Sequence, residues 1–107
     1  MFQPADETGY NSPLEKIRMK TLTYGEKTLM VKFRFEAGAR LPRHSHSHEQ
    51  TGYLISGRMD LTVGDCVYQV NPGDSWSIPG DVEHGVMVLE ETVAIEVFSP
   101  VREDYLP

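Results

Sequence analysis

The sequence predicts an all-β fold, a small sandwich or barrel, and three observations support this prediction. Apolar and polar residues alternate between Leu29 and Glu36, which is the period of a strand with one buried face. Glycine, proline, asparagine and aspartate recur at short intervals and separate segments of strand length. No window shows a sustained helical period. With 107 residues, of which 39% are apolar, the chain is expected to bury one core.

The expected elements follow in order along the chain. Residues 1–13 contain two prolines, a glycine and several polar groups, so they are expected to form an N-terminal arm before a folded domain at 14–107. Residues 16–22 and 28–36 are expected to pair around a hairpin turn at 24–27. Further strands, each rich in β-forming residues, are expected at 50–56, 58–63, 66–70, 75–78, 85–89 and 92–99. The proline-broken tail is expected to pack across a barrel mouth or against a partner.

Composition excludes several classes of partner. The formal net charge of −6 argues against binding to nucleic acid and to anionic membrane surfaces. No apolar run is long enough for a transmembrane helix, and the polar, acidic start argues against a signal peptide. The lone Cys66 has no partner for an internal disulfide, which suits a reducing cytoplasm, and is interpreted as a small apolar strand residue.

Three histidines occupy alternate positions in the segment RHSHSHEQ, residues 43–50. On a strand, His44, His46 and His48 would point the same way. A solvent-exposed polar strand is one explanation for this pattern. A second explanation is a metal site, because this block and a later turn-bounded block with His84 can bring three imidazoles to one point in a barrel.

Two blocks of the chain resemble the two consensus blocks of the cupins. These are residues 38–57, GARLPRHSHSHEQTGYLISG, and residues 73–84, GDSWSIPGDVEH. Cupins are small antiparallel jelly-roll barrels, also called double-stranded β-helices, that bind one divalent metal ion inside. The resemblance covers roughly residues 29–99 and implies a single-domain cupin.

The same resemblance implies a set of metal ligands, His44, His46 and His84, with position 50 as the fourth. Most cupins have Glu at that position, whereas this chain has Gln50, and a site of three histidines alone is the alternative. Three neutral imidazoles and a neutral amide would leave the double charge of the ion uncompensated, which favours a strong Lewis acid and an anionic ligand. The ion is expected to be Ni, Zn, Fe, Mn or Co, since these ligands do not identify it. The cupin spacing skips His48, which is expected to lie outside the ligand set.

The segment 92–99 alternates between an aliphatic face and a face that carries Glu96 and Phe98. Strand faces usually sort apolar inward and polar outward, which would place Glu96 on the surface. A barrel with a wet interior allows the reverse, so both orientations stay open at this point. Trp76 is expected in the core or at an interface rather than stacked on a ligand.

A closer resemblance connects residues 44–57, 72–85 and 97–106 with the KdgF subfamily of cupins, which takes part in pectin degradation. Members of that subfamily act on 4,5-unsaturated uronate monosaccharides released by polysaccharide lyases and promote their conversion to the linear keto form. The resemblance implies that Glu96, Phe98 and Arg102 are the catalytic acid, aromatic residue and arginine. The subfamily commonly has Asp where this chain has Glu96, which is one methylene longer. An ordinary surface charge is the alternative for Arg102.

The resemblance therefore predicts a metal-dependent enzyme that opens and ketonises an unsaturated uronate, with the metal as Lewis acid and Glu96 as acid and base. The expected partner is a small anionic sugar substrate, and neither nucleic acid nor a membrane is expected to bind. Another metal-dependent cupin enzyme, such as a dioxygenase, and a non-catalytic sugar- or metal-binding cupin are the alternatives. Small cupins commonly pair, so a homodimer is expected, with the aliphatic face of residues 92–99 as a candidate surface.

Overall fold

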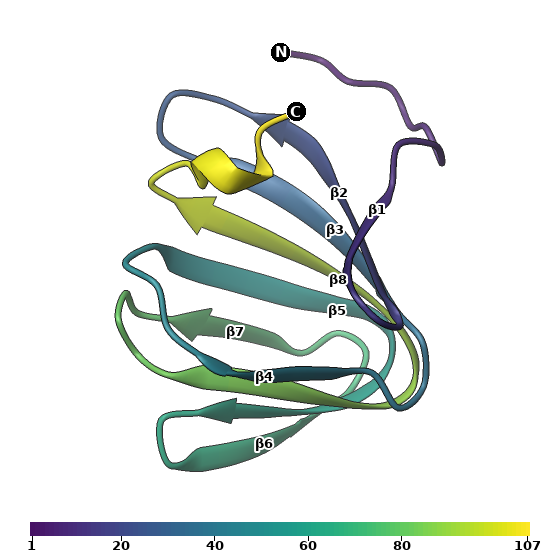
Figure 1. Cartoon of the computed structure of the whole chain (residues 1–107), viewed down its shortest axis with the longest axis vertical. Helices are drawn as coiled ribbons and strands as arrows, with labels where there is room; N and C mark the ends of the chain where they lie inside the picture. Colours follow the sequence, from purple (N-terminus) through teal and green to yellow (C-terminus); the bar gives the residue numbers. More distant parts are fainter.

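The computed structural model describes residues 1–107 and contains eight strands and one short 3₁₀ helix (Figure 1). None of its helical structure has the length and apolar character that crossing a membrane requires. The elements are β1 (Asn11–Leu14), β2 (Ile17–Tyr24), β3 (Leu29–Phe35), β4 (Arg40–His44), β5 (Glu49–Val63), β6 (Cys66–Val70), β7 (Ser75–Ile78), β8 (His84–Ser99) and η1 (Glu103–Tyr105).

All eight strands are hydrogen-bonded into one antiparallel sheet that folds over on itself. Strands β1, β2 and β3 continue into the C-terminal half of β8, which pairs with the N-terminal half of β5 and then β7. Strand β4 pairs with the N-terminal half of β8, and β6 pairs with the C-terminal half of β5. In Figure 1, β2 and β3 lie in the upper part of the fold, and β4, β6 and β7 lie below. The result is the jelly-roll arrangement that the sequence predicts.

The largest difference from the expected elements is the length of β5 and β8. The segments 50–56 and 58–63 are one strand, and so are 85–89 and 92–99. Gly57 was expected to make a turn, but it lies in a bulge where the register between β5 and β8 shifts. Between Leu54 and Met59 the pairing advances five residues on β5 but six on β8, and across this irregular region the buried positions of β5 change from Gln50 and Leu54 to Met59 and Leu61. Both halves of the strand therefore face the same interior.

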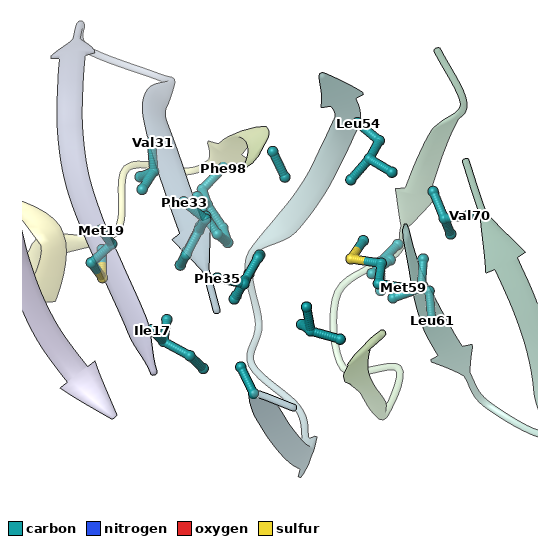
Figure 2. Close-up of a cluster of buried hydrophobic side chains, with 14 of the residues drawn as sticks. Ile17, Met19, Val31, Phe33, Phe35, Leu54, Met59, Leu61, Val70 and Phe98 are labelled. Carbon is teal, nitrogen blue, oxygen red and sulfur yellow. The ribbon is translucent and has the colours of Figure 1, made fainter. Parts of the chain in front are cut away.

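The core lies between the two halves of the folded sheet. Fifteen buried apolar residues form one cluster. Figure 2 shows side chains of β2, β3, β5 and β6 converging in it. The rings of Phe33 and Phe35 are stacked, with 5.6 Å between their centroids. Phe98 belongs to this cluster and is 2% exposed. The inner face of the last strand is thus a core face, although it also carries Glu96.

The N-terminal segment is more ordered than an arm that ends at residue 13. Asn11–Leu14 form the exposed strand β1, which pairs with β2 although Pro13 has no backbone N–H to donate. Before it, Glu7 forms an ion pair with Arg34 at 2.8 Å, and Tyr10 accepts a hydrogen bond from Arg34 Nε at 3.1 Å. These contacts tie residues 7–10 to the outer face of β3, although residues 1–9 are themselves exposed.

The bend at Gly57 generates a prediction about stability. Gly57 and Gly73 share a φ of 93°, but an added Cβ meets nothing within 4 Å at Gly73, whereas at Gly57 it would lie 2.2 Å from Thr92 Oγ1. We expect Gly73→Ala to cost roughly 1–2 kcal/mol from backbone strain alone, and Gly57→Ala roughly 2–5 kcal/mol, because the clash adds to the strain. Urea denaturation of both variants measures the difference. Equal losses would show that the packing of β5 on β8 does not depend on this glycine.

Candidate metal centre

Three histidine side chains meet at one end of the fold. His44 ends β4, His84 begins β8 and is its direct pairing partner, and His46 lies in the connection from β4 to β5. Their candidate ligand nitrogens all lie within 4.8 Å of one another. The structure therefore brings together the His-x-His block and the single histidine of the second block, and this group could hold a metal ion.

The histidine tract is not one continuous strand. Residues 45–48 connect β4 to β5, so the shared direction expected for three alternating strand residues does not apply. The ring of His48 lies 5.6 Å from that of His46 and outside the three-histidine group. What His48 supplies is its backbone oxygen, which lies 2.9 Å from His46 Nδ1.

Each of the three imidazoles is oriented by a backbone carbonyl. The Nδ1 atoms of His44, His46 and His84 lie 2.9, 2.9 and 2.8 Å from the oxygens of residues 42, 48 and 82. A carbonyl oxygen only accepts hydrogen bonds, so each Nδ1 carries the proton and each Nε2 presents a lone pair. Such second contacts fix the ring and tautomer of metal-binding histidines in proteins. The three rings are thus arranged as ligands through Nε2.

Burial disfavours the charged form of two of the three imidazoles, those of His46 and His84. Desolvation lowers the pKa of His46, and the positive charge of Arg102 lowers it further. Hydrogen bonds to the His48 carbonyl and the Gln50 side chain act in the opposite direction and raise it. Desolvation also lowers the pKa of His84, which is 2% exposed. Neutral imidazole is the form that binds a metal, so the surroundings favour ligation before any ion arrives.

Buried polar atoms without a hydrogen-bond partner also fit a metal ion. Four such atoms occur, and three of them are His46 Nε2, His84 Nε2 and Gln50 Oε1. Unpaired buried polar atoms are costly, so each calls for an explanation such as an ion. A cation at the three-histidine group would give the two imidazole nitrogens a partner. The fourth atom is His48 Nδ1, outside that group.

The hydrogen bond to Glu96 orients the side chain of Gln50. Its Nε2 donates to Glu96 Oε1 at 2.8 Å, and Gln50 is 5% exposed. The amide oxygen remains as the free acceptor on this side chain. Gln50 and Phe98 are direct partners in the pairing of β5 with β8, which brings the amide beside the inner face of β8.

Glu96 points into the fold rather than to the surface. Its Oε1 accepts hydrogen bonds from Gln50 Nε2 and from Trp76 Nε1, both at 2.8 Å. Desolvation raises the pKa of Glu96, and these two hydrogen bonds and the charge of Arg102 oppose that rise. Of the two orientations open from the sequence, the structure has Glu96 and Phe98 inward and the aliphatic residues of β8 outward. The surface orientation is wrong for this strand.

Arg102 lies beside the site but already has a partner. Its Nε and Nη2 donate to the carboxylate of Asp104 at 3.2 and 2.7 Å, which lowers the pKa of Asp104. The guanidinium lies 5.1 Å from the ring centroid of Phe98 and 4.0 Å from that of Tyr105. Because its side chain is only 15% exposed, Arg102 is not an ordinary surface charge. Its Nη1 atom has no hydrogen-bond partner in the protein.

A cavity of about 330 Å³ connects these groups. Both ends of the chain border it, β1 through Pro13 and Leu14 and the C-terminal tail through Arg102 and Tyr105. The tail thus packs across the mouth of the barrel, one of the two positions expected for it. The polar and charged residues in the lining include Arg43, His44, Gln50, His84, Glu96 and Arg102. A small anionic molecule would meet imidazoles, an acid and a guanidinium in one space.

Two residues of the site were not predicted from the sequence. Trp76, expected in the core or at an interface, is half-buried against the core and donates to Glu96. Tyr105, on η1, lines the cavity and packs on Phe98 at 5.5 Å between ring centroids. Alternation along a strand gives no signal for either contact. Cys66, expected as a small apolar residue, is in strand β6 but is exposed.

Comparisons with known proteins agree with this architecture. The family described as "Cupin domain" matches residues 31–99. The pectin degradation protein KdgF of Dickeya dadantii (strain 3937) is 32% identical over 103 residues, which cover 94% of each chain. Two solved structures are also similar to this chain. KdgF from a Halomonas species has a TM-score of 0.93 at 29% identity and covers 99% of this chain and 100% of its own.

The second solved structure is an RmlC-like cupin from Shewanella frigidimarina. It has a TM-score of 0.92 at 28% identity and covers 98% of this chain and 95% of its own. The family match spans more than half of the chain, and the similarity to KdgF extends over nearly all of it. This chain belongs to the cupin family and within it is a relative of the pectin degradation protein KdgF.

Proposed function

We propose that this protein is a metal-dependent enzyme that converts a 4,5-unsaturated uronate monosaccharide into its linear keto form. The observation that carries the proposal is the position of Glu96, a half-buried residue whose carboxyl is hydrogen-bonded to Gln50 and borders the cavity beside the three histidines. The similarity to a pectin degradation protein supports a uronate as the substrate class.

The proposed metal ligands are His44, His46 and His84 through Nε2, with Gln50 Oε1 as the fourth. The protonated Nδ1 atoms and the unpaired buried atoms support this set. When bound, a divalent transition metal would act as a Lewis acid that stabilises negative charge on the carboxylate and enolate oxygens of the sugar and favours the ionised form of Glu96. The neutral ligand set leaves the charge of the ion available for an anionic substrate.

The reaction is an isomerisation that needs one proton moved between two atoms of the sugar. Ring opening breaks the bond between the ring oxygen and C1, and the proton of the C1 hydroxyl passes to the ring oxygen, which leaves an aldehyde at C1 and an enol at C5. The enol loses its hydroxyl proton and C4 gains one, which gives the ketone. Glu96 is the group we assign to proton transfer, since its carboxyl borders the cavity. Desolvation also raises its pKa, so the carboxyl holds a proton more readily than it would in water.

Arg102 and the two aromatic residues are assigned to binding. The free Nη1 of Arg102 can donate to the sugar carboxylate while Asp104 keeps the guanidinium in place. Phe98 and Tyr105 contact each other and hold the guanidinium above their rings. Together they exclude water from one wall of the cavity, which strengthens electrostatic interactions with the substrate.

A homodimer in the reducing cytoplasm is the assembly that we propose. On the outer face of the sheet, Met30 pairs with Val97 and Tyr53 pairs with Ile95, so apolar residues of β3, β8 and β5 lie side by side. Met30 is 36% exposed and Tyr53 is 50% exposed in the single chain. A second copy would cover this apolar strip. The exposed free thiol of Cys66 supports the reducing compartment.

The catalytic proposal predicts that the protein removes the C4=C5 bond of an unsaturated galacturonate. We expect the ultraviolet absorbance of that bond to fall faster than the spontaneous rate when metal-loaded protein is added. Glu96→Gln should keep fold and metal but lower the rate roughly 10²–10⁴-fold, because the amide cannot carry the proton. Glu91→Gln changes an exposed residue of the same strand and should have full activity. An unaccelerated reaction with wild-type protein, or oxygen consumption instead, would exclude this function.

The ligand set predicts a difference between two histidines of the chain. His84→Ala should lose stoichiometric metal after dialysis against nickel or zinc, whereas His48→Ala should retain it, since His48 lies outside the three-histidine group. Elemental analysis measures the metal. Chelation should also lower the melting temperature of the wild type but not of His84→Ala, because only a protein that binds the ion is stabilised by it. Metal loss in His48→Ala alone would contradict the proposed set.

The proposed dimer predicts a change in mass upon charging the apolar strip. We expect Tyr53→Glu to convert a dimer into a monomer, because a carboxylate buried between two copies would lack a partner. Val67→Glu, on the exposed face of β6, should remain dimeric. Light scattering after size-exclusion chromatography gives both masses, and a monomeric wild type would disprove the proposal.

A further inference from the structure

We infer that Trp76 is a positioning residue for Glu96, holding Oε1 of the carboxyl so that Oε2 is the oxygen presented to the substrate. The inference rests on the proposed function, since it identifies which oxygen transfers the proton. Trp76 Nε1 donates to Oε1 at 2.8 Å, and Gln50 Nε2 donates to the same atom at 2.8 Å. No hydrogen bond within the protein reaches Oε2, and Glu96 borders the cavity.

The contact between Trp76 and Glu96 spans three strands. Gly52 on β5 is the direct pairing partner of Trp76 on β7 and of Glu96 on β8. The two side chains therefore start on either side of β5, roughly 10 Å apart at the backbone by ordinary strand spacing. The indole must lie across β5 to reach the carboxyl.

Gly52 makes this crossing possible because it has no side chain. A Cβ at this position would lie 2.1 Å from Cε2 of Trp76 and 2.3 Å from its Nε1. Unlike Gly57, Gly52 does not have a positive φ. Its backbone conformation thus allows any residue, and the space taken by the indole is what requires glycine.

Two donors on one oxygen have a definite chemical consequence. The indole N–H and the amide N–H only donate, so Oε1 serves them as an acceptor whether or not the carboxyl is protonated. A proton on the carboxyl must then reside on Oε2. The direction of transfer is thereby fixed toward the cavity, and removal of the indole donor leaves the carboxyl held by Gln50 alone.

The contact itself can be tested without any substrate, because Trp76 is the only tryptophan of the chain. Metal-loaded, ¹⁵N-labelled protein should show one indole N–H cross-peak. We expect that peak to move in Gly52→Ala, where the indole is displaced, and in Glu96→Ala, where its acceptor is lost. Gly25→Ala is the matched control, since a Cβ there meets nothing within 4 Å, and it should leave the peak in place. An unmoved peak in Glu96→Ala would overturn the inference.

The positioning role is tested by kinetics on two further variants, Trp76→Phe and Glu96→Gln. Trp76→Phe keeps an aromatic ring and loses only the donor, so we expect kcat to fall roughly tenfold to a hundredfold with KM nearly unchanged. In a Glu96→Gln background, Trp76→Phe should cost little more, because a residue that acts through Glu96 has nothing left to position. A tryptophan that merely packs would give additive losses or a change in KM, and either result would refute the role.

Failure of this inference and failure of the proposed function give different results. If wild-type protein does not accelerate loss of the C4=C5 bond, the proposed function is wrong and Trp76 has no catalytic acid to position, whatever the spectra show. If the wild type is active but Trp76→Phe retains its kcat, the function stands and the positioning role is wrong. Circular dichroism and melting temperature verify that each variant is folded before either conclusion is drawn.

Discussion

The antiparallel pairing of β5 with β8 is the interaction on which the rest of the structure depends. These are the two longest strands, and they belong to both halves of the folded sheet. Gln50 lies near one end of β5, and His84 and Glu96 lie at opposite ends of β8. A slip of one residue in this register would turn Gln50 or Glu96 to the outside. The bulge at Gly57 keeps both halves of β5 facing inward while the pairing continues.

The interior combines an apolar core with a polar site, and hydrogen bonding explains how the two coexist. Buried polar atoms are costly unless they have partners. At the site, the Nδ1 atoms have backbone carbonyls and Glu96 Oε1 has two donors. Three of the four atoms left without partners are those that could bind a cation. The histidines thus use Nδ1 for hydrogen bonds within the protein, and Nε2 of His46 and of His84 has no protein partner.

Much of the fold and part of the site could be predicted from the sequence, for physical reasons that differ by element. Segments 66–70 and 75–78 were predicted with the observed bounds because turn residues flank them. The grouping of three histidines followed from the spacing of two turn-bounded blocks. The inward direction of Glu96 did not follow from alternation, because a period of two separates the faces of a strand without saying which is inside; only the resemblance to the KdgF subfamily favoured it. The Trp76 contact depends on pairing between distant strands, which no local pattern encodes.

The hydrogen bond between Gln50 and Glu96 links the identity of one residue to that of the other. A Glu at position 50 would bring two carboxylates to the 2.8 Å that now separates an amide nitrogen from a carboxylate oxygen. Two carboxyls at such a distance cannot both ionise, so one would have to hold the proton that the pair shares. With an amide at position 50, Glu96 does not share its proton with a second carboxyl, and the amide oxygen is left without a hydrogen-bond partner. A neutral side chain among the proposed ligands and an independent acid one hydrogen bond away are therefore parts of the same arrangement.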